Sequence, residues 1–274
     1  MQAIHVKNVT KTFGNRLRAL DDVSLTLEAG EMVALIGASG SGKSTLIRHI
    51  AGLITANRGS GGGEITAMGE TVQSQGRISR KITAVRHKLG VIFQQFNLVP
   101  RLSVLTNVLT GRLGQIPRLR GTCMIFTHRE KQIAMQALIR VGIGETARQR
   151  ASTLSGGQQQ RAAIARCLVQ EAEIILADEP IASLDPASAK RVMQILSEIN
   201  RTENAAILVS LHQVEYARRY CPRTIAMRDG RIVFDGPSEQ LTTDFLREIY
   251  GEASEELILP DADAFAPMKT AVAS

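Results

Sequence analysis

The chain has 274 residues, of which 44% are hydrophobic, so it can bury one large core or two small ones. No apolar run approaches the roughly 18 residues that a membrane span needs, and the first residues lack the order of a signal peptide, so we expect a cytosolic protein. The formal net charge of +7 suits a nucleic acid, an anionic membrane surface or solubility alone, although 4% aromatic residues argue against a protein that stacks bases.

The N-terminal segment shows the period-two pattern of half-buried strands. Apolar and polar residues alternate over residues 4–7 and again over 23–28, which predicts a small N-terminal sheet. Phe13 lies between these strands, just before a turn. On its own, Phe13 is interpreted as an ordinary half-buried aromatic residue.

A glycine-rich loop follows the next apolar run. Residues 32–36 predict a buried strand, residues 37–45 fit the pattern G-x-x-x-x-G-K-[ST], and residues 45–51 indicate a helix. Backbone N–H groups of such a loop and helix terminus bind phosphate oxygens. Lys43 would reach the β- and γ-phosphates, and the Ser44 hydroxyl would bind Mg²⁺. The predicted nucleotide-binding residues are Gly37, Ser39, Gly40, Ser41, Gly42, Lys43, Ser44 and Thr45.

Residues 64–141 change from strand to helix patterns. Residues 64–72 resemble a hairpin, the basic segment 77–88 is interpreted as solvated surface, and residues 91–93 predict a core strand that runs into Gln94. From Leu102 to Val141 the apolar spacing is helical, with a capping box at Thr127–Glu130, so we expect a helical insertion. Residues 111–126 within it are irregular and are interpreted as a contact loop.

A second glycine-rich turn, Leu-Ser-Gly-Gly-Gln at residues 154–158, opens a helix. Ser155 is a suitable N-cap, and the two glycines would leave the first N–H groups uncovered, which predicts another phosphate-binding helix terminus. We infer a ligand here because glycine in a first turn weakens a helix without helping its packing. The predicted ligand-binding residues are Ser155, Gly156, Gly157 and Gln158.

Carboxylates follow the apolar run 174–177. Asp178 is suited to hold Mg²⁺, and Glu179 to orient or deprotonate an attacking water. Asp185 and Pro186 then supply an N-cap and a first-turn proline. Another buried strand at 205–210 leads to His212, and a hairpin lies around residues 228–231. The alternation predicts an α/β fold in which helices cover a largely parallel sheet.

Three cysteines, Cys123, Cys167 and Cys221, are far apart in the sequence and form no C-x-x-C pair. Neither a disulfide framework nor a zinc site is indicated. We interpret them as reduced packing residues.

The order of these motifs resembles the ATP-binding subunit of an ABC transporter across about residues 1–240. The resemblance implies a RecA-like P-loop NTPase core with an N-terminal antiparallel β-subdomain and an inserted α-helical subdomain at about residues 96–160. We expect an ABC ATPase domain at 1–250. The acidic tail at 251–274 is expected to be disordered, with a regulatory role as the minority interpretation.

The same resemblance implies roles for individual residues. Phe13 would stack on adenine, Gln94 would sense the γ-phosphate and Mg²⁺ while touching a membrane partner, and His212 would contact the γ-phosphate. Glu179, His212 and Gln94 are thus the implied catalytic residues. Asp185 would join the nucleotide site. The turn at 154–158 would serve ATP held by another copy, so that two subunits enclose two nucleotides.

A finer resemblance is to the phosphonate import ATP-binding proteins. It is carried by residues 93–99, 103–105, 154–161, 176–186 and 211–217. It implies ATP and Mg²⁺ as cofactors, integral membrane permease subunits as partners and, indirectly, a substrate-binding protein outside the membrane. The implied location is the cytoplasmic face of the inner membrane, and the implied substrates are phosphonates, with phosphite or phosphate esters as further candidates.

Two short stretches depart from the general ABC pattern. Ile181-Ala182-Ser183 stands where Thr-Ser-Ala is usual, and Gln213 stands where Asp usually follows the histidine. Neither change removes a phosphate or metal ligand.

Other ATPase classes fit less well or stay open. Leu154 follows Lys43 by 111 positions, too few for the long coiled coils of DNA-repair relatives, and the chain carries one ATPase unit where translation-type members carry two. We therefore expect no nucleic-acid partner. An ABC-type ATPase that joins a soluble carbon–phosphorus lyase complex remains an alternative.

Overall fold

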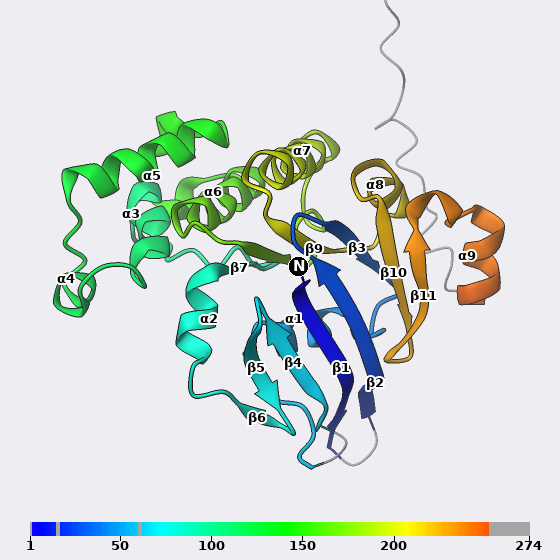
Figure 1. The fold of residues 1–274 in the computed structure, drawn as a ribbon. Helices are drawn as coiled ribbons and strands as arrows, with labels where there is room; N and C mark the ends of the chain where they lie inside the picture. The colour runs from blue at the N-terminus through cyan, green and yellow to red at the C-terminus, as the bar shows by residue number, and fades with distance from the viewer. Residues whose placement is uncertain (1, 15–16, 60–61, 252–274) are drawn as a thin grey trace, which may run out of the picture.

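The computed structural model describes residues 2–14, 17–59 and 62–251, which form two sheets surrounded by helices (Figure 1). The expectation for the tail at 252–274 lies outside the described residues. Among those that are described, no helix is both long and apolar enough to cross a lipid bilayer.

The larger sheet has six strands in the order β11-β10-β3-β9-β8-β7. The strands from β10 to β7 are parallel, and only β11 is antiparallel. Their bounds are β3 (Met32–Ile36), β7 (Leu89–Ile92), β8 (Ile174–Ala177), β9 (Ala206–Leu211), β10 (Arg223–Arg228) and β11 (Arg231–Pro237). Every residue of β3, β8 and β9 is buried, as expected for a parallel sheet covered on both faces.

The smaller sheet has five strands in the order β2-β1-β4-β5-β6, all paired antiparallel. They are β1 (Gln2–Phe13), β2 (Leu17–Glu28), β4 (Glu64–Ala67), β5 (Glu70–Ser74) and β6 (Arg77–Ile78). Both the predicted N-terminal sheet and the predicted hairpin at 64–72 are confirmed. The turn of that hairpin, Met68-Gly69, has two positive φ angles of 51° and 75°, which suits a tight hairpin turn.

Helices lie around the sheets, and Figure 1 shows α6 and α7 along one side of the six-stranded sheet. Their bounds are α1 (Lys43–Ile50), α2 (Ile82–Lys88), α3 (Val104–Leu109), α4 (Arg118–Thr122), α5 (His128–Arg140), α6 (Gly156–Val169), α7 (Pro186–Glu203), α8 (Val214–Tyr220) and α9 (Thr243–Tyr250). The α5 capping box at Thr127 and Glu130 is present as predicted. Short 3₁₀ turns are at Thr110–Arg112, Gly144–Thr146, Ala151–Thr153 and Ser238–Gln240.

The six-stranded sheet separates two hydrophobic cores. Ala34 and Ile36 of β3 face a core shared with α3, α5, α6 and α7. Val33 and Leu35 face the other core, which lies between the two sheets and includes α1. Successive side chains of β3 point to opposite faces of the sheet, and both faces are buried. The sequence of β3 therefore shows no polar positions.

Several sequence interpretations were wrong or incomplete. The Arg and Lys residues of segment 77–88 are exposed, as expected, but the segment also forms β6 and α2, and Val85 is buried. The loop at 111–126 contains the short helix α4. Cys123 is exposed and is not a packing residue. Burial raises the pKa of Cys167 to about 11 and that of Cys221 to about 12. Helices α8 and α9 were not predicted.

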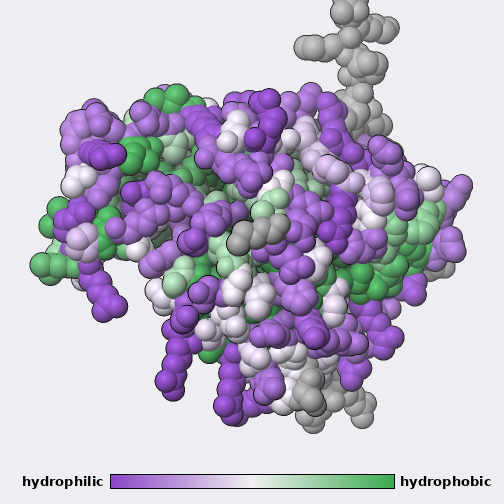
Figure 2. Space-filling view, viewed as in Figure 1, coloured by the Kyte–Doolittle hydropathy of each residue, from purple (hydrophilic) through white to green (hydrophobic). Residues whose placement is uncertain are grey.

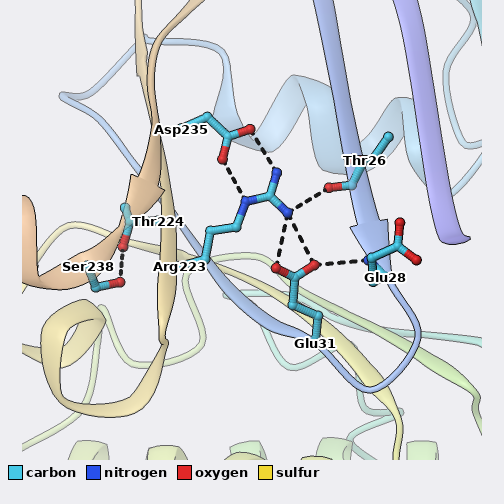
Figure 3. A network of polar contacts seen from close by, with 7 residues as sticks. All are labelled: Thr26, Glu28, Glu31, Arg223, Thr224, Asp235 and Ser238. Atoms are coloured by element: carbon cyan, nitrogen blue, oxygen red, sulfur yellow. Dashed lines mark hydrogen bonds and ion pairs between the residues drawn. The ribbon is translucent and has the colours of Figure 1, made fainter. Parts of the chain in front are cut away.

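A polar network joins the two sheets (Figure 3). The Arg223 guanidinium on β10 donates two hydrogen bonds to the Asp235 carboxylate on β11, at 2.6 and 2.8 Å. It also donates to the Glu31 carboxylate at 3.0 and 3.2 Å and to the Thr26 carbonyl oxygen on β2 at 3.1 Å. These partners raise the pKa of Arg223, so the cation persists at any ordinary pH and holds the edge of β2 against β10.

Replacement of this cation should lower the stability of the whole chain. Arg223→Ala leaves Glu31 and Asp235 without their shared partner, so we expect the free energy of unfolding to fall by about 1–3 kcal/mol. Urea unfolding at equilibrium measures it. Arg218→Ala, which removes an exposed arginine of α8, is the matched control; an equal effect of the two changes would contradict a role for the network.

Candidate active site

The carboxyl ends of four neighbouring parallel strands meet at one edge of the sheet. There β3 runs into the phosphate loop, β9 leads to His212, β8 leads to Asp178 and Glu179, and β7 leads towards Gln94. Parallel sheets bind ligands at this edge, because the loops that leave adjacent strands converge on it. Residues that are far apart in the sequence are therefore brought together.

The phosphate loop wraps around the start of α1. The Lys43 side chain is only 4% exposed, and its ammonium donates to the carbonyl oxygens of Gly37 at 2.7 Å and Ala38 at 3.2 Å. Gly42 has φ of 104°, and a Cβ there would lie 2.5 Å from the Ala19 carbonyl oxygen. Only glycine therefore fits. No side chain caps the start of α1, and the N-terminus of a helix is a place that suits an anion.

A cavity of about 320 Å³ lies over this loop, lined by Ser39 to Thr45 together with Phe13, Ala19 and Glu179. Phe13 ends β1 and is 43% exposed. The Lys11 ammonium lies 5.0 Å from the centre of its ring. Phe13 is more exposed than an ordinary packing residue, and it lines the cavity instead of joining either hydrophobic core.

One carboxylate oxygen connects three segments of the site. The Ser44 hydroxyl donates to Asp178 Oδ1 at 2.8 Å, and the Ser210 hydroxyl donates to the same atom at 3.1 Å. Ser210 also accepts a hydrogen bond from the Glu179 N–H at 2.8 Å. Sequence reasoning missed Ser210. The sequence did contain a signal for it, because Ser210 is a polar residue in the otherwise apolar strand β9, just before His212.

Glu179 is held in a particular position. Its φ of 50° is in the left-handed region, which costs energy for a residue with a Cβ and is often found at functional sites. Its Oε1 lies 2.7 Å from Nε2 of His212. That hydrogen bond, helped by the charge of Lys43 and opposed by burial, holds the pKa of Glu179 below its usual value. Glu179 is therefore ionised at neutral pH.

Gln94 is exposed in the turn that follows β7. Asp178 N–H donates to the Ile92 carbonyl oxygen at 2.8 Å, so this turn begins beside the carboxylate pair. Arg166 of α6 donates to the carbonyl oxygens of Asn97 at 2.8 Å and Phe96 at 3.4 Å. The Gln94 turn is thus linked both to the site and to the helix that begins at the second glycine-rich turn.

That second turn is capped as predicted. Ser155 Oγ accepts from the Gln158 N–H at 3.3 Å, and Gln158 Oε1 accepts from the Ser155 N–H at 3.0 Å. Ser155 to Gln158 are nevertheless not among the residues that line the phosphate-loop cavity. In the part of the chain that the structure describes, the cavity over the phosphate loop therefore does not extend to the second turn.

Residues 20–182 match the family model described as ABC transporter. The chain belongs to the ABC transporter family. It is 57% identical over 262 residues to Phosphonates import ATP-binding protein PhnC of Cupriavidus pinatubonensis, covering 96% of this chain and 92% of that one. It is also 57% identical to Phosphonates import ATP-binding protein PhnC 2 of Pseudomonas syringae pv. syringae, covering 94% and 92%.

Solved ABC cassettes share the fold. The dimeric structure of MJ0796, a bacterial ABC transporter cassette, has a TM-score of 0.75 and 33% identity, covering 86% of this chain and 98% of that one. A post-hydrolysis MJ0796 dimer bound to ADP and Pi has a TM-score of 0.72 and 32% identity over the same shares. The α/β ABC ATPase fold is thereby confirmed, and the chain is an ATP-binding ABC ATPase.

In this ABC cassette, one of the two glycines at 156–157 is needed for packing. A Cβ on Gly157 would lie 2.5 Å from Ser188 Oγ and 2.8 Å from Ser188 Cβ, in the first turn of α7. A Cβ on Gly156 would meet the Leu184 side chain at an ordinary 3.4 Å. The inference that neither glycine helps packing was therefore wrong for Gly157. Gly156 is the glycine that packing does not explain.

Asp185 lies beside this contact. Its carboxylate caps α7 by accepting the Ser188 N–H at 2.9 Å, and hydrogen bonds from Ser188 lower the pKa of Asp185. Asp185 is not among the residues that line the phosphate-loop cavity. In this ABC cassette it sits next to the 154–158 turn, through the contact between Ser188 and Gly157.

The close contact gives a stability prediction. Gly157→Ala should lower the free energy of unfolding by about 1–3 kcal/mol through overpacking, whereas Gly156→Ala should leave it unchanged or slightly higher. Urea unfolding of both variants compares them. Adding Ser188→Gly to Gly157→Ala removes the colliding atoms and should recover part of the loss; no recovery would show that Ser188 is not the cause.

The contact between His212 and Glu179 gives a pH prediction. The folded-state pKa of Glu179 is lowered relative to about 4.3 in an unfolded chain. The contact therefore adds stability above that pH, and this stability is lost as the pH falls through the folded-state pKa. His212→Ala should lower the free energy of unfolding by about 1 kcal/mol at neutral pH, and the difference should shrink in acid. His128→Ala, at the exposed start of α5, is the control; a difference that does not depend on pH would contradict the assignment.

Proposed function

We propose that this ABC ATPase energises the import of phosphonates, with phosphite or phosphate esters as further candidate substrates. The proposal of substrate is supported by 57% identity to phosphonates import ATP-binding proteins along nearly the full chain. The proposal of ATP hydrolysis here is supported by the convergence of Lys43, Asp178, Glu179 and His212 at the ends of adjacent strands.

The first step is nucleotide capture. N–H groups of the loop from Gly37 to Thr45 hold the phosphates, Lys43 offers its charge to the β- and γ-phosphates, and Phe13 at the cavity rim stacks on adenine. The oxygens of Ser44 and Asp178 lie next to each other and suit Mg²⁺. Proteins usually hold this ion through one or two carboxylates, and phosphate oxygens supply further ligands. Bound there with Gln94, the ion would neutralise charge on the phosphates.

The second step is attack by water. The ionised Glu179 carboxylate orients the water opposite the γ-phosphate and accepts its proton. His212, which lies within hydrogen-bond distance of Glu179, contacts the γ-phosphate. Ser210 holds the Glu179 backbone and thereby acts as a positioning residue.

A second copy of the chain completes each site. Ser155 to Gln158 and Asp185 lie apart from the phosphate-loop cavity of their own chain, and a partner copy presents them to the nucleotide. ATP binding closes the two copies, and hydrolysis reopens them. The Gln94 turn, joined to α6 through Arg166, passes this movement to the permease.

The remaining assignments follow from the importer role. The protein is peripheral at the cytoplasmic face of the inner membrane, and its partners are integral permease subunits and, indirectly, a substrate-binding protein outside. Residues 1–250 form the ATPase domain, with the helical subdomain at about 96–160 and a tail from 251.

An ABC-type ATPase of a soluble carbon–phosphorus lyase complex is the second candidate. Co-purification separates the two. Recovery with two integral membrane chains supports transport, whereas recovery only with soluble enzymes contradicts it. Uptake of labelled phosphonate, phosphite and phosphate by vesicles that carry the whole complex then tests the substrate range.

The role of Glu179 is tested by Glu179→Gln, which keeps the shape of the side chain and removes the base. We expect ATP to bind while kcat falls by about 10²–10⁴-fold. Steady-state ATPase assays and equilibrium nucleotide binding measure the two effects separately.

Lys43→Ala is the companion variant, and it should weaken nucleotide binding itself because it removes the phosphate-facing charge. Wild-type turnover in Glu179→Gln, or unchanged ATP affinity in Lys43→Ala, would refute the respective role.

A further inference from the structure

The positive charge of the chain is concentrated in one segment. Between Glu70 and Glu130 there is no Asp or Glu, while the same stretch contains ten Arg and Lys residues. These exceed the net charge of +7 for the whole chain, so the rest of the protein is net negative. The ten residues are Arg77, Arg80, Lys81, Arg86, Lys88, Arg101, Arg112, Arg118, Arg120 and Arg129.

Part of this segment projects from the protein as an apolar tip. Ile116 and Phe126 are buried in the core at 9% and 8% exposure, and residues 117–125 between them form what we call the α4 protrusion. On it, Leu119 is 80% and Ile125 58% exposed. Figure 2 shows hydrophobic colour at the end of the molecule where Figure 1 places α4.

The protrusion has a fixed conformation. The Arg120 guanidinium makes two hydrogen bonds to the Glu130 carboxylate, at 3.1 and 3.2 Å, and holds the pKa of Glu130 below its usual value. Glu130 in turn accepts the Thr127 N–H at 2.7 Å, within the α5 capping box. Arg120 therefore orients the protrusion and is not a free contact residue. The apolar side chains are thus exposed on a segment that hydrogen bonds hold in place. An exposed apolar patch of this kind marks an interaction surface.

Basic residues border the tip. Arg118 precedes Leu119, and Arg129 lies in the first turn of α5; both are exposed. Neither forms an ion pair with any residue in the part of the chain that the structure describes. An apolar tip with an unpaired basic border has the chemistry of a segment that enters the interface of an anionic bilayer.

We propose that the α4 protrusion docks on an anionic phospholipid surface, with Leu119, Met124 and Ile125 among the acyl chains near the headgroups and Arg118 and Arg129 at the phosphates. This inference deepens the proposed function, because an importer ATPase works beside a membrane. A lipid surface suits the observations better than a protein groove, since a segment without any acidic residue complements a surface of uniform negative charge.

Vesicle flotation with the full chain tests the proposal. We expect binding to vesicles of phosphatidylglycerol and phosphatidylethanolamine, weakened by salt, and little binding to phosphatidylcholine vesicles. Leu119→Ser with Ile125→Ser should lower the partition coefficient about tenfold or more. Arg118→Glu with Arg129→Glu should lower it by a similar factor and remove the preference for anionic lipid.

Matched controls lie outside the protrusion. Ile139→Ser removes a residue of α5 that is 61% exposed, and Arg201→Glu with Arg218→Glu reverses two exposed charges elsewhere; neither should change vesicle binding. ATPase activity in the same preparations reports on the proposed function separately: its absence from the wild-type chain would contradict the ATPase role without bearing on lipid docking.

Three outcomes would overturn the proposal. They are equal binding of the wild-type chain to both kinds of vesicle, wild-type binding by the protrusion variants, and equal losses in the control variants. If the protrusion variants bind lipid normally but fail to assemble with the permease chains, the surface is a protein contact and the lipid proposal is wrong.

Discussion

The site depends on a single carboxylate oxygen. Asp178 Oδ1 accepts hydrogen bonds from Ser44 at the start of α1 and from Ser210 on β9, so it joins β9 to the segments that follow β3 and β8. Because Asp178 is only 4% exposed, its charge depends on these donors for solvation. The Ser44 hydroxyl that stabilises this carboxylate also belongs to the Mg²⁺ site that we propose. Structure and proposed chemistry thus depend on the same contacts.

Around that oxygen, the residues that the sequence predicts for the nucleotide site lie in two separate groups. Lys43, Asp178, Glu179 and His212 lie together at one sheet edge, whereas the turn at 154–158 is capped and packed against α7 without joining the phosphate-loop cavity. The packing of Gly157 on Ser188 couples that turn to α7 as well as to its own helix. Gly157 therefore serves the fold, whereas packing does not explain the glycine at position 156.

The proposed lipid docking gives the helical insertion a second role, beside its link to the nucleotide site. The insertion begins beside the Gln94 turn, where Arg166 of α6 donates to the Asn97 carbonyl oxygen, and it also contains the apolar protrusion at 117–125. The two features depend on different contacts, since the protrusion is held by Arg120 and Glu130. A substitution at the tip can therefore change membrane contact without disturbing the nucleotide site.

The sequence by itself determined the fold class, the order of the strands and helices that carry motifs, and the residues of the phosphate loop and carboxylate pair. These follow from local patterns: apolar runs, glycine spacing and N-caps such as Asp185. Only the tertiary structure showed that Ser210 shares the oxygen of Asp178, that Gly157 is required by Ser188, that Phe13 is exposed, and that Arg120 is tied to Glu130. The contacts of Ser210, Gly157 and Arg120 are made by chain folding, either between distant segments or within a loop without periodicity, and the exposure of Phe13 also depends on how the chain folds around it. No local pattern encodes such a contact, so the three-dimensional arrangement of the chain decided it.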